Sequence, residues 1–390
     1  MFFIVKAGLL RYNKTISADT GKEKGVALKT DVIIPVYRPG RELLELLNRL
    51  REQTMPVHRI ILMNTEKKYF EELMAQTGTD FAKTYGNAEV HHLSKREFDH
   101  GGTRHRAVQY SRADIFVMMT QDAMPADRYL IERLTAPLRE GLAQERAEKA
   151  SAGAAQEKAL ADAVWEASAD EAMGEAPAGA ADGRNIRVAV AYGRQLPGRD
   201  SSEAEKFSRY FNYPKESRIK TSDDLETMGI KTFFCSNVCA AYRRDIYEES
   251  GGFVRHTIFN EDMIYAAGMI RAGYGIAYEA GARVVHSHNY TNMQQLRRNF
   301  DLGVSQAEHP EVFRGVPSET EGKRLVKAVF RDMKRRRELY RFPGFCVQCG
   351  FKYAGYLLGK NYRKLPEKWI PALTNSKEYW KQEETICAEL

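Results

Sequence analysis

The stretch "DIFVMMTQDAMPADRYL", residues 114–130, decides the fold of this chain. Residues 115–119 are all apolar and favour β structure, which is typical of a strand buried on both faces of a parallel sheet. The carboxylate of Asp122 follows almost at once, and Pro125 is predicted to end the pairing with neighbouring strands. A charge at the tip of a core strand indicates either a turn residue that caps the next helix or a functional site at the edge of the sheet.

Strand and helix patterns alternate on both sides of this stretch. The strand patterns cover residues 31–37, 58–66, 89–94 and 187–195, and the helical patterns cover residues 41–53, 102–113 and 261–272. This alternation predicts an α/β fold with a Rossmann-like, mostly parallel mixed sheet flanked by helices. Ligands bind such sheets outside the carboxyl ends of the strands, and Pro35, Asn64 and Asp122 all fall at such ends. We therefore expect Asp122 to face a crevice.

The positive charge of the chain is concentrated near its C-terminus. The chain has 390 residues, of which 43% are hydrophobic, and a net charge of +7. Residues 323–368 contain 14 Lys and Arg against three acidic residues. Their interleaving with Phe, Tyr and Leu suits a helical region that lies on an anionic membrane surface. A helical cap on the rest of the chain and a subunit interface are the alternatives, and no nucleic-acid recognition module accompanies the charge.

Targeting signals and a disulfide framework are not visible in the sequence. No segment is long and apolar enough to span a bilayer, which takes about 20 residues, and the run "MFFIVKAGLL" lacks a signal-peptide cleavage pattern. Five cysteines in a chain of this length predict reduced thiols in a cytoplasmic protein. A four-thiolate zinc site is the less favoured interpretation of Cys235, Cys239, Cys346 and Cys349.

Composition also suggests how the chain is divided. Residues 139–185 are rich in Ala and Glu and poor in branched apolar residues, which predicts a surface insertion that is helical or loose. We expect an N-terminal extension at residues 1–30, an α/β domain at residues 31–305 that carries this insertion, and a basic helical region at residues 306–390.

The stretch "FNEDMIYAAG" places Glu261 and Asp262 in the first turn of a predicted helix. The structural interpretation is that Asn260 caps the helix and that both acids complement the helix dipole. The functional interpretation depends on position, because the pair follows the glycine turn of "ESGGF". A glycine turn beside a carboxylate lets a sugar approach closely while a base reaches its attacking hydroxyl.

Two further groups of polar residues fall near the same predicted edge. The backbone N–H groups and Arg104 of "HGGTR" suit a phosphate or a nucleobase, although an ordinary loop-to-helix transition explains them equally well. His286 and His288 end a strand, and alternate residues of a strand share one face. Both imidazoles can therefore point into the crevice, where a metal-ligand role beside Asp122 competes with that of a plain surface residue.

Together these stretches resemble the inverting family 2 glycosyltransferases of the GT-A fold, and more narrowly their rhamnosyltransferase-like branch. The resemblance covers most of residues 31–305 and is carried by "VIIPVYRPG", "EFDHGGTRHRA", "FVMMTQDAMP", "AYGRQLPGRD", "FSRYFNYP", "SNVCAAYRRDIYEESGGF" and "FNEDMIYAAGMIRAGYGIAYEAGARVVHSHNY". The chain departs from the family pattern at two places. Asn64, Thr65 and Glu66 replace the usual acids after the second strand, and Thr120 replaces the first acid of the DXD motif.

The resemblance implies a role for each group of candidate residues. Asp122, the last acid of the DXD motif, and His286 would hold Mg²⁺ or Mn²⁺ on the diphosphate of the donor. Asp262, beside Glu261, would be the general base that deprotonates the acceptor. The nucleotide-sugar site would comprise Pro35, Tyr37, Asn64, Gly102, Arg104, Gln121 and Asp122, and a sugar-binding loop would comprise Gly251, Gly252 and Phe253 together with His288.

The expected activity is transfer of a sugar, L-rhamnose from dTDP-rhamnose, to a saccharide or lipid-linked saccharide in cell-surface polysaccharide synthesis. A UDP-linked hexose or N-acetylhexosamine is the alternative donor. A sugar-nucleotide pyrophosphorylase would need a glycine-rich, Lys-bearing loop that "PVYRPGRE" does not supply. A catalytically silent saccharide-binding subunit is a third hypothesis.

We expect Asp262 to have the ordinary Asp pKa of about 4. We also expect the protein on the cytoplasmic face of the plasma membrane.

Overall fold

The computed structural model describes residues 28–166, 186–316 and 319–381. The strands are β1 (Thr30–Tyr37), β2 (Arg59–Thr65), β3 (Ala88–Leu93), β4 (Ile115–Met119), β5 (Met124–Pro125), β6 (Val188–Leu196), β7 (Arg218–Lys220), β8 (Cys239–Arg243) and β9 (Gly275–Val285). The helices are α1 (Arg41–Arg51), α2 (Lys67–Thr77), α3 (Phe81–Thr84), α4 (His100–Tyr110), α5 (Leu130–Glu166), α6 (Glu203–Asn212), α7 (Leu225–Met228), α8 (Arg244–Glu249), α9 (Glu261–Arg271), α10 (Asn292–Glu308), α11 (Pro310–Phe313), α12 (Glu319–Arg336), α13 (Phe342–Lys360) and α14 (Ile370–Leu373). Short 3-10 helices are η1 (Ser222–Asp224), η2 (Gly229–Thr232), η3 (Leu339–Arg341), η4 (Tyr362–Lys364) and η5 (Glu367–Trp369).

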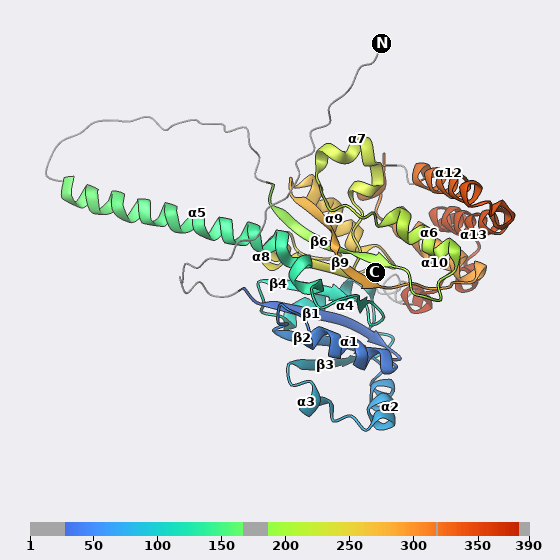
Figure 1. The fold of residues 1–390 in the computed structure, drawn as a ribbon, viewed down its shortest axis with the longest axis horizontal. Coiled ribbons are helices and arrows are strands. Elements are labelled where there is room, and N and C mark those ends of the chain that lie inside the picture. Colours follow the sequence, from blue (N-terminus) through green and yellow to red (C-terminus); the bar gives the residue numbers. More distant parts are fainter. Residues whose placement is uncertain (1–27, 167–185, 317–318, 382–390) are drawn as a thin grey trace, which may run out of the picture.

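A nine-stranded sheet lies at the centre of the described residues, with the strand order β3-β2-β1-β4-β8-β6-β9-β5 and with β7 paired to β9 (Figure 1). The pairings make β1, β2, β3, β4, β6 and β9 run in one direction, whereas β5, β7 and β8 run in the other. The predicted α/β fold with a mostly parallel mixed sheet is therefore confirmed.

Apolar residues on both faces of the sheet explain why helices cover both. In β1, Val32 and Ile34 face one hydrophobic cluster and Ile33 faces the other, because side chains alternate along a strand. The helical stripe of α1, with four buried leucines, packs on the first face together with the start of α5. Helices α4, α8 and α9 cover the second face. Burial on both faces is what makes the strands continuous apolar runs in the sequence.

The prediction that Pro125 ends strand pairing is wrong. Strand β5 pairs antiparallel with β9, with Pro125 opposite Val284. A proline is tolerated there because β5 is the last strand of the sheet and its missing N–H leaves no neighbour unpaired. Asp122 therefore lies in the turn between β4 and β5, and it does not cap a helix, because α5 begins only at Leu130.

The Ala/Glu-rich segment continues α5 away from the sheet (Figure 1). The start of the helix is anchored by core leucines and, further along, by Glu145, which bonds the guanidinium groups of Arg243 and Arg187. The predicted insertion at residues 139–185 is thus helical up to Glu166. Its remaining part, and most of the predicted N-terminal extension, lie outside the described residues.

The C-terminal helices pack closely against each other at one end of the sheet (Figure 1). A Cβ atom on Gly355 of α13 would lie 2.1 Å from the carbonyl oxygen of Leu296, and one on Gly359 would lie 2.1 Å from that of Phe300. Glycine is required at both positions because the backbones of α10 and α13 touch there. Helix α10 also runs across the domain boundary predicted at residue 305. Within the described residues, each helix is too short or too polar to cross a bilayer.

Candidate active site

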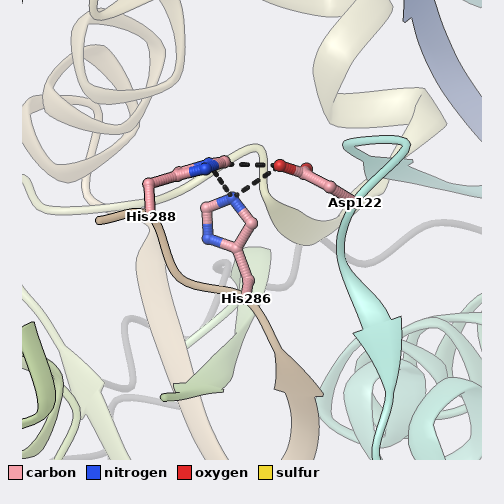
Figure 2. Close-up of side chains that lie close together, drawn as sticks. All are labelled: Asp122, His286 and His288. Carbon is pink, nitrogen blue, oxygen red and sulfur yellow. Dashed lines mark hydrogen bonds and ion pairs between the residues drawn. The ribbon is translucent and has the colours of Figure 1, made fainter. Parts of the chain in front are cut away.

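Three metal-ligand side chains meet where β4 and β9 end (Figure 2). The Oδ2 atom of Asp122 lies 3.1 Å from Nε2 of His288 and 3.5 Å from Nε2 of His286. The two Nε2 atoms are 3.1 Å apart. Both imidazoles point the same way because they are two residues apart on an extended segment, and the pairing of β5 with β9 brings Asp122 to them.

The hydrogen bonds of Gln195 fix the protonation of His286. Gln195 is buried near the end of β6, and its Oε1 accepts a hydrogen bond from Arg209, whose guanidinium can only donate. The same oxygen lies 3.1 Å from Nδ1 of His286, so Nδ1 carries the proton and Nε2 keeps its lone pair. That lone pair faces the carboxylate of Asp122. Two electron-rich groups that converge in this way suit a cation between them.

Burial and polar contacts shift the pKa values of Asp122 and His286 in opposite directions. Burial would raise the pKa of Asp122, but the N–H groups and positive charge that His286 and His288 offer when they are protonated outweigh it and hold the pKa well below the ordinary range. Burial lowers the pKa of His286, and Asp122 offsets this only in part. Near neutral pH, Asp122 is therefore ionised and His286 is neutral, which are the states in which both groups bind a divalent metal.

Asp262 stands in the first turn of α9 and is held by two backbone N–H groups. Its Oδ2 accepts from Asn237 at 2.8 Å, and its Oδ1 accepts from Met263 at 2.7 Å. Burial and the neighbouring carboxylate of Glu261 nevertheless raise the pKa of Asp262 well above its ordinary value. The expectation of an ordinary pKa is therefore wrong. An acid with a raised pKa is a stronger base once it is ionised, which suits proton abstraction near neutral pH.

Glu261 is a buried anchor beside this base. Its Oε1 lies 3.2 Å from Nη1 of Arg104 and accepts a 3.0 Å hydrogen bond from Nδ2 of Asn237. Only 6% of the Glu261 side chain and 8% of the Arg104 side chain are exposed. The pair therefore fixes the start of α9 against α4, and Arg104 offsets part of the effect of the Glu261 charge on the pKa of Asp262.

Asn260 precedes α9 but does not cap it through its side chain, so the predicted capping role is wrong. Its backbone is left-handed, with φ of 65°, and its Nδ2 donates to Oγ of Ser305 at 3.2 Å. Asn tolerates this conformation better than most residues do. The hydrogen bond ties the start of α9 to α10.

One cavity joins the two acidic groups. Its volume is about 660 Å³, and its walls include Asp122, both histidines and Asp262. This volume is typical of small-molecule sites, which measure about 300–1,000 Å³. A carboxylate with metal-ligand partners and a carboxylate with a raised pKa thus face the same ligand-sized space.

A second cavity of about 350 Å³ lies beside the first. Its walls include Tyr37 and Thr65 at the carboxyl ends of β1 and β2, and His100 borders both cavities. Tyr37 exchanges two hydrogen bonds with the side chain of Gln121: its N–H donates at 3.0 Å and its carbonyl accepts at 2.9 Å. This exchange ties the turn that carries Asp122 to the end of β1.

Comparison with known proteins identifies the family. Residues 31–144 match the family described as glycosyl transferase family 2. The chain is 32% identical over 355 residues to the O-antigen chain rhamnosyltransferase RfbN of Salmonella typhimurium, an alignment that covers 90% of this chain and 96% of that protein. The chain belongs to glycosyltransferase family 2. The family membership and the enzyme class predicted from the sequence are thereby confirmed.

A second relative of this transferase is the O-antigen chain rhamnosyltransferase WbaN of Salmonella anatum, which is 32% identical over 352 residues, with 90% of this chain and 95% of that protein covered. Among solved structures, the mannosyltransferase PcManGT from Pyrobaculum calidifontis in complex with GDP-Man and Mn²⁺ aligns at 13% identity and a TM-score of 0.44, covering 93% of this chain and 90% of that chain. Residues 1–349 of S. aureus TarS align at 12% identity and a TM-score of 0.42, covering 86% and 92%.

The glycine turn predicted to contact a sugar packs its last residue, Phe253, into the core of the transferase. Gly251 and Gly252 both have positive φ, and they direct Phe253 into an aromatic cluster with Tyr242, Tyr247 and Tyr265. Phe253 is only 2% exposed, and none of the three turn residues borders either cavity. In the structure, the turn serves the packing of this cluster. His288, expected in the same loop, belongs to the group around Asp122.

Two residues predicted from the sequence to bind the nucleotide sugar, Asn64 and Gly102, make contacts within the protein. Asn64 is fully buried in β2, where its Nδ2 lies 2.9 Å from Nδ1 of His92, and it borders neither cavity. The N–H of Gly102 donates to Asp99 at 2.7 Å, and a Cβ there would lie 2.5 Å from the carbonyl oxygen of Arg255. Gly102 therefore permits close packing of α4, and its N–H is not available to a phosphate.

Several residues of the cavity were not anticipated. Gln195 ends a predicted strand, so the rule that pointed to Asp122 would also have found it. Arg298 and Lys352 line the cavity from α10 and α13, and no local pattern distinguishes them from other basic residues of that region. Among the described residues, no cysteine belongs to a group that could share a metal ion, so the four-thiolate zinc site does not form there.

Proposed function

We propose that this family 2 glycosyltransferase moves L-rhamnose from dTDP-L-rhamnose to a saccharide acceptor in the synthesis of a cell-surface polysaccharide. The names of the two Salmonella relatives, which align with 90% of this chain, support the choice of sugar and of polysaccharide. The observation that carries the chemistry is the single cavity bordered by Asp122, His286, His288 and Asp262.

The residues of this chain account for inverting transfer. Asp262 accepts the proton of the acceptor hydroxyl as the oxygen forms its bond to the anomeric carbon. The bond from that carbon to the donor diphosphate breaks, and its electron pair stays on the diphosphate oxygen. The N–H groups of Asn237 and Met263 hold the base in position, and a single displacement needs no protein nucleophile.

The group formed by Asp122, His286 and His288 fits a divalent cation. It offers a carboxylate oxygen and the free Nε2 lone pair of His286, with a second imidazole in reach of the same position. This mixture of oxygen and nitrogen ligands favours Mn²⁺, whereas Mg²⁺ prefers oxygen ligands. When bound there, the cation stabilises the negative charge of the leaving diphosphate.

We place the nucleoside of the donor in the second cavity. Tyr37 offers an aromatic ring at its edge and is 39% exposed. His100, which borders both cavities, would then lie between the nucleoside and the diphosphate.

A donor screen tests the proposed activity. The purified protein with Mn²⁺ and an acceptor saccharide should transfer label from dTDP-L-rhamnose, and it should transfer little from UDP-glucose, UDP-galactose or UDP-N-acetylglucosamine. Preferential transfer from any of the UDP sugars would overturn the choice of donor, although it would leave the enzyme class intact.

We infer further that the acceptor is lipid-linked and that the C-terminal helices lie against the anionic cytoplasmic face of the plasma membrane. Tyr340 and Tyr353 are 75% and 53% exposed next to the basic helix α12, which supports insertion at a headgroup layer. Replacing both tyrosines by Glu should reduce flotation with anionic liposomes. Equal flotation of the variant and the wild type would contradict attachment through this surface.

A further inference from the structure

Two basic side chains of the C-terminal helices, Arg298 and Lys352, line the cavity without counter-ions. Of the acids that line it, Glu205 is bound by Arg209 at 2.7 Å and Glu261 by Arg104. Asp122 and Asp262 are occupied by the contacts described above. Across the described residues, neither Arg298 nor Lys352 takes part in an ion pair or a hydrogen bond, although both line the same cavity.

Arg298 is held in place without using its hydrogen-bond donors. Its guanidinium carbon lies 4.8 Å from the ring centre of Phe259 and 5.8 Å from that of Tyr290. Contacts with aromatic faces orient a guanidinium while its N–H groups stay available for a planar or tetrahedral anion.

Lys352 is brought to the cavity by the glycine contacts between α10 and α13. It lies one helical turn before Gly355, the residue whose backbone touches the carbonyl oxygen of Leu296. Burial lowers the pKa of Lys352, as expected for a half-buried ammonium group that lacks a strong counter-ion. A negatively charged ligand would stabilise the ammonium form of Lys352, because this half-buried group lacks a strong counter-ion.

We propose that Arg298 and Lys352 together bind the diphosphate of the sugar-nucleotide donor in the cavity that holds Asp122 and Asp262. This inference rests on the proposed function, since it assumes a donor of that class. Each phosphate of such a donor carries one negative charge, and transfer leaves one further charge on the terminal oxygen. A divalent cation beside the Asp122 carboxylate contributes a net charge of only about +1, so two more positive groups would balance the released nucleoside diphosphate.

The diphosphate of a lipid-linked acceptor has the same chemistry and is the competing source. The donor is favoured because the charge that develops during the reaction appears on its diphosphate, and cations that bind there stabilise the transition state. An acceptor diphosphate gains no charge in the reaction.

Binding of nucleotides without turnover tests this inference. The dissociation constants of dTDP and dTMP should be measured by calorimetry with Mn²⁺ for the wild type, Arg298→Gln and Lys352→Gln. Each variant should bind dTDP about tenfold more weakly or worse, because a charge-assisted contact is lost, whereas binding of dTMP should change much less. Lys327→Gln, an exposed lysine of α12, is the matched control and should bind both nucleotides as the wild type does.

The same titrations with UDP and UMP separate this inference from the choice of donor. If the protein binds UDP in preference to dTDP, the proposed donor fails, but a selective loss of UDP affinity in both variants still supports the diphosphate site. Unchanged diphosphate affinity in both variants overturns the site. A raised KM for a lipid-linked acceptor with unchanged dTDP affinity likewise overturns it and assigns the cations to the acceptor. Melting temperatures close to that of the wild type should accompany each variant, because the replaced side chains make no ion pair.

Discussion

At the scale of single residues, the environment of Asp262 determines how readily this proposed base takes up a proton. Two backbone N–H groups stabilise its ionised form, whereas burial and the adjacent carboxylate of Glu261 destabilise that form and prevail. The result is a carboxylate that takes up a proton more readily than a solvent-exposed one. The reaction needs this ability only when the acceptor hydroxyl is in place.

Asp262→Asn should lower the transfer rate by about three orders of magnitude and leave dTDP binding intact, because only the proton acceptor is lost. In the wild type, the base acts in its ionised form, so kcat should fall as pH drops below the raised pKa of Asp262. An activity that stays level down to a pH of about 5 would contradict the raised pKa.

Stability provides the control for this variant. The folded state binds the Asp262 proton more tightly than the unfolded state does, so stability decreases as pH rises from the unfolded pKa of about 4 through the folded pKa. The Asn variant lacks this loss. At pH values above the folded pKa this gain offsets the backbone hydrogen bond that the NH2 group of Asn cannot accept, so the variant should melt close to the wild-type temperature. A marked drop would indicate that lost activity reflects unfolding.

Residues at strand ends could be predicted, but their partners could not. Asp122 was found because the carboxyl ends of parallel strands form ligand sites whatever the rest of the fold is. The role of Gln195 in orienting His286 depends on Arg209, which comes from a separate helix. Nor does the sequence reveal that Phe253, which follows the glycine turn, packs in an aromatic cluster.

At the scale of elements, the contact between α10 and α13 is the least obvious feature of the sequence and the most demanding sterically. Glycines in a helix normally cost stability relative to Ala. Glycine is needed at positions 355 and 359 because any side chain there would clash with the backbone of α10. By contrast, a Cβ at Gly350 of the same helix would meet nothing within 4 Å.

Gly355→Ala should destabilise the protein by about 2 kcal/mol, because the new methyl group overlaps a carbonyl that cannot move aside. Gly350→Ala is the matched control and should stabilise it by about 0.5 kcal/mol through its helix propensity. Chemical unfolding of both variants measures the difference. Equal effects of the two substitutions would show that the helices do not touch at Gly355.

The strands and amphipathic helices followed from short-range patterns, whereas this crossing did not. The leucines of α1 repeat at helical spacing and indicate a buried face directly. Gly355 and Leu296 are far apart in the chain, and no periodic pattern in the sequence predicts that they are in contact.

At the scale of the whole molecule, the sheet and the C-terminal helices build one site together. The sheet edge supplies Asp122 and the histidines, α9 supplies Asp262, and α10 and α13 close another wall with Arg298 and Lys352. A transferase needs this convergence because the leaving diphosphate and the attacking hydroxyl must be activated at the same time.

The most direct test of this arrangement is the dissociation constant of dTDP measured with and without Mn²⁺ for the wild type and for Asp122→Ala. In the wild type, Mn²⁺ should tighten dTDP binding by about tenfold or more, which corresponds to about 1.4 kcal/mol, and in the variant Mn²⁺ should have no effect. An affinity for dTDP that is independent of Mn²⁺ in the wild type, or a variant that responds to Mn²⁺ as the wild type does, would contradict a cation site at Asp122.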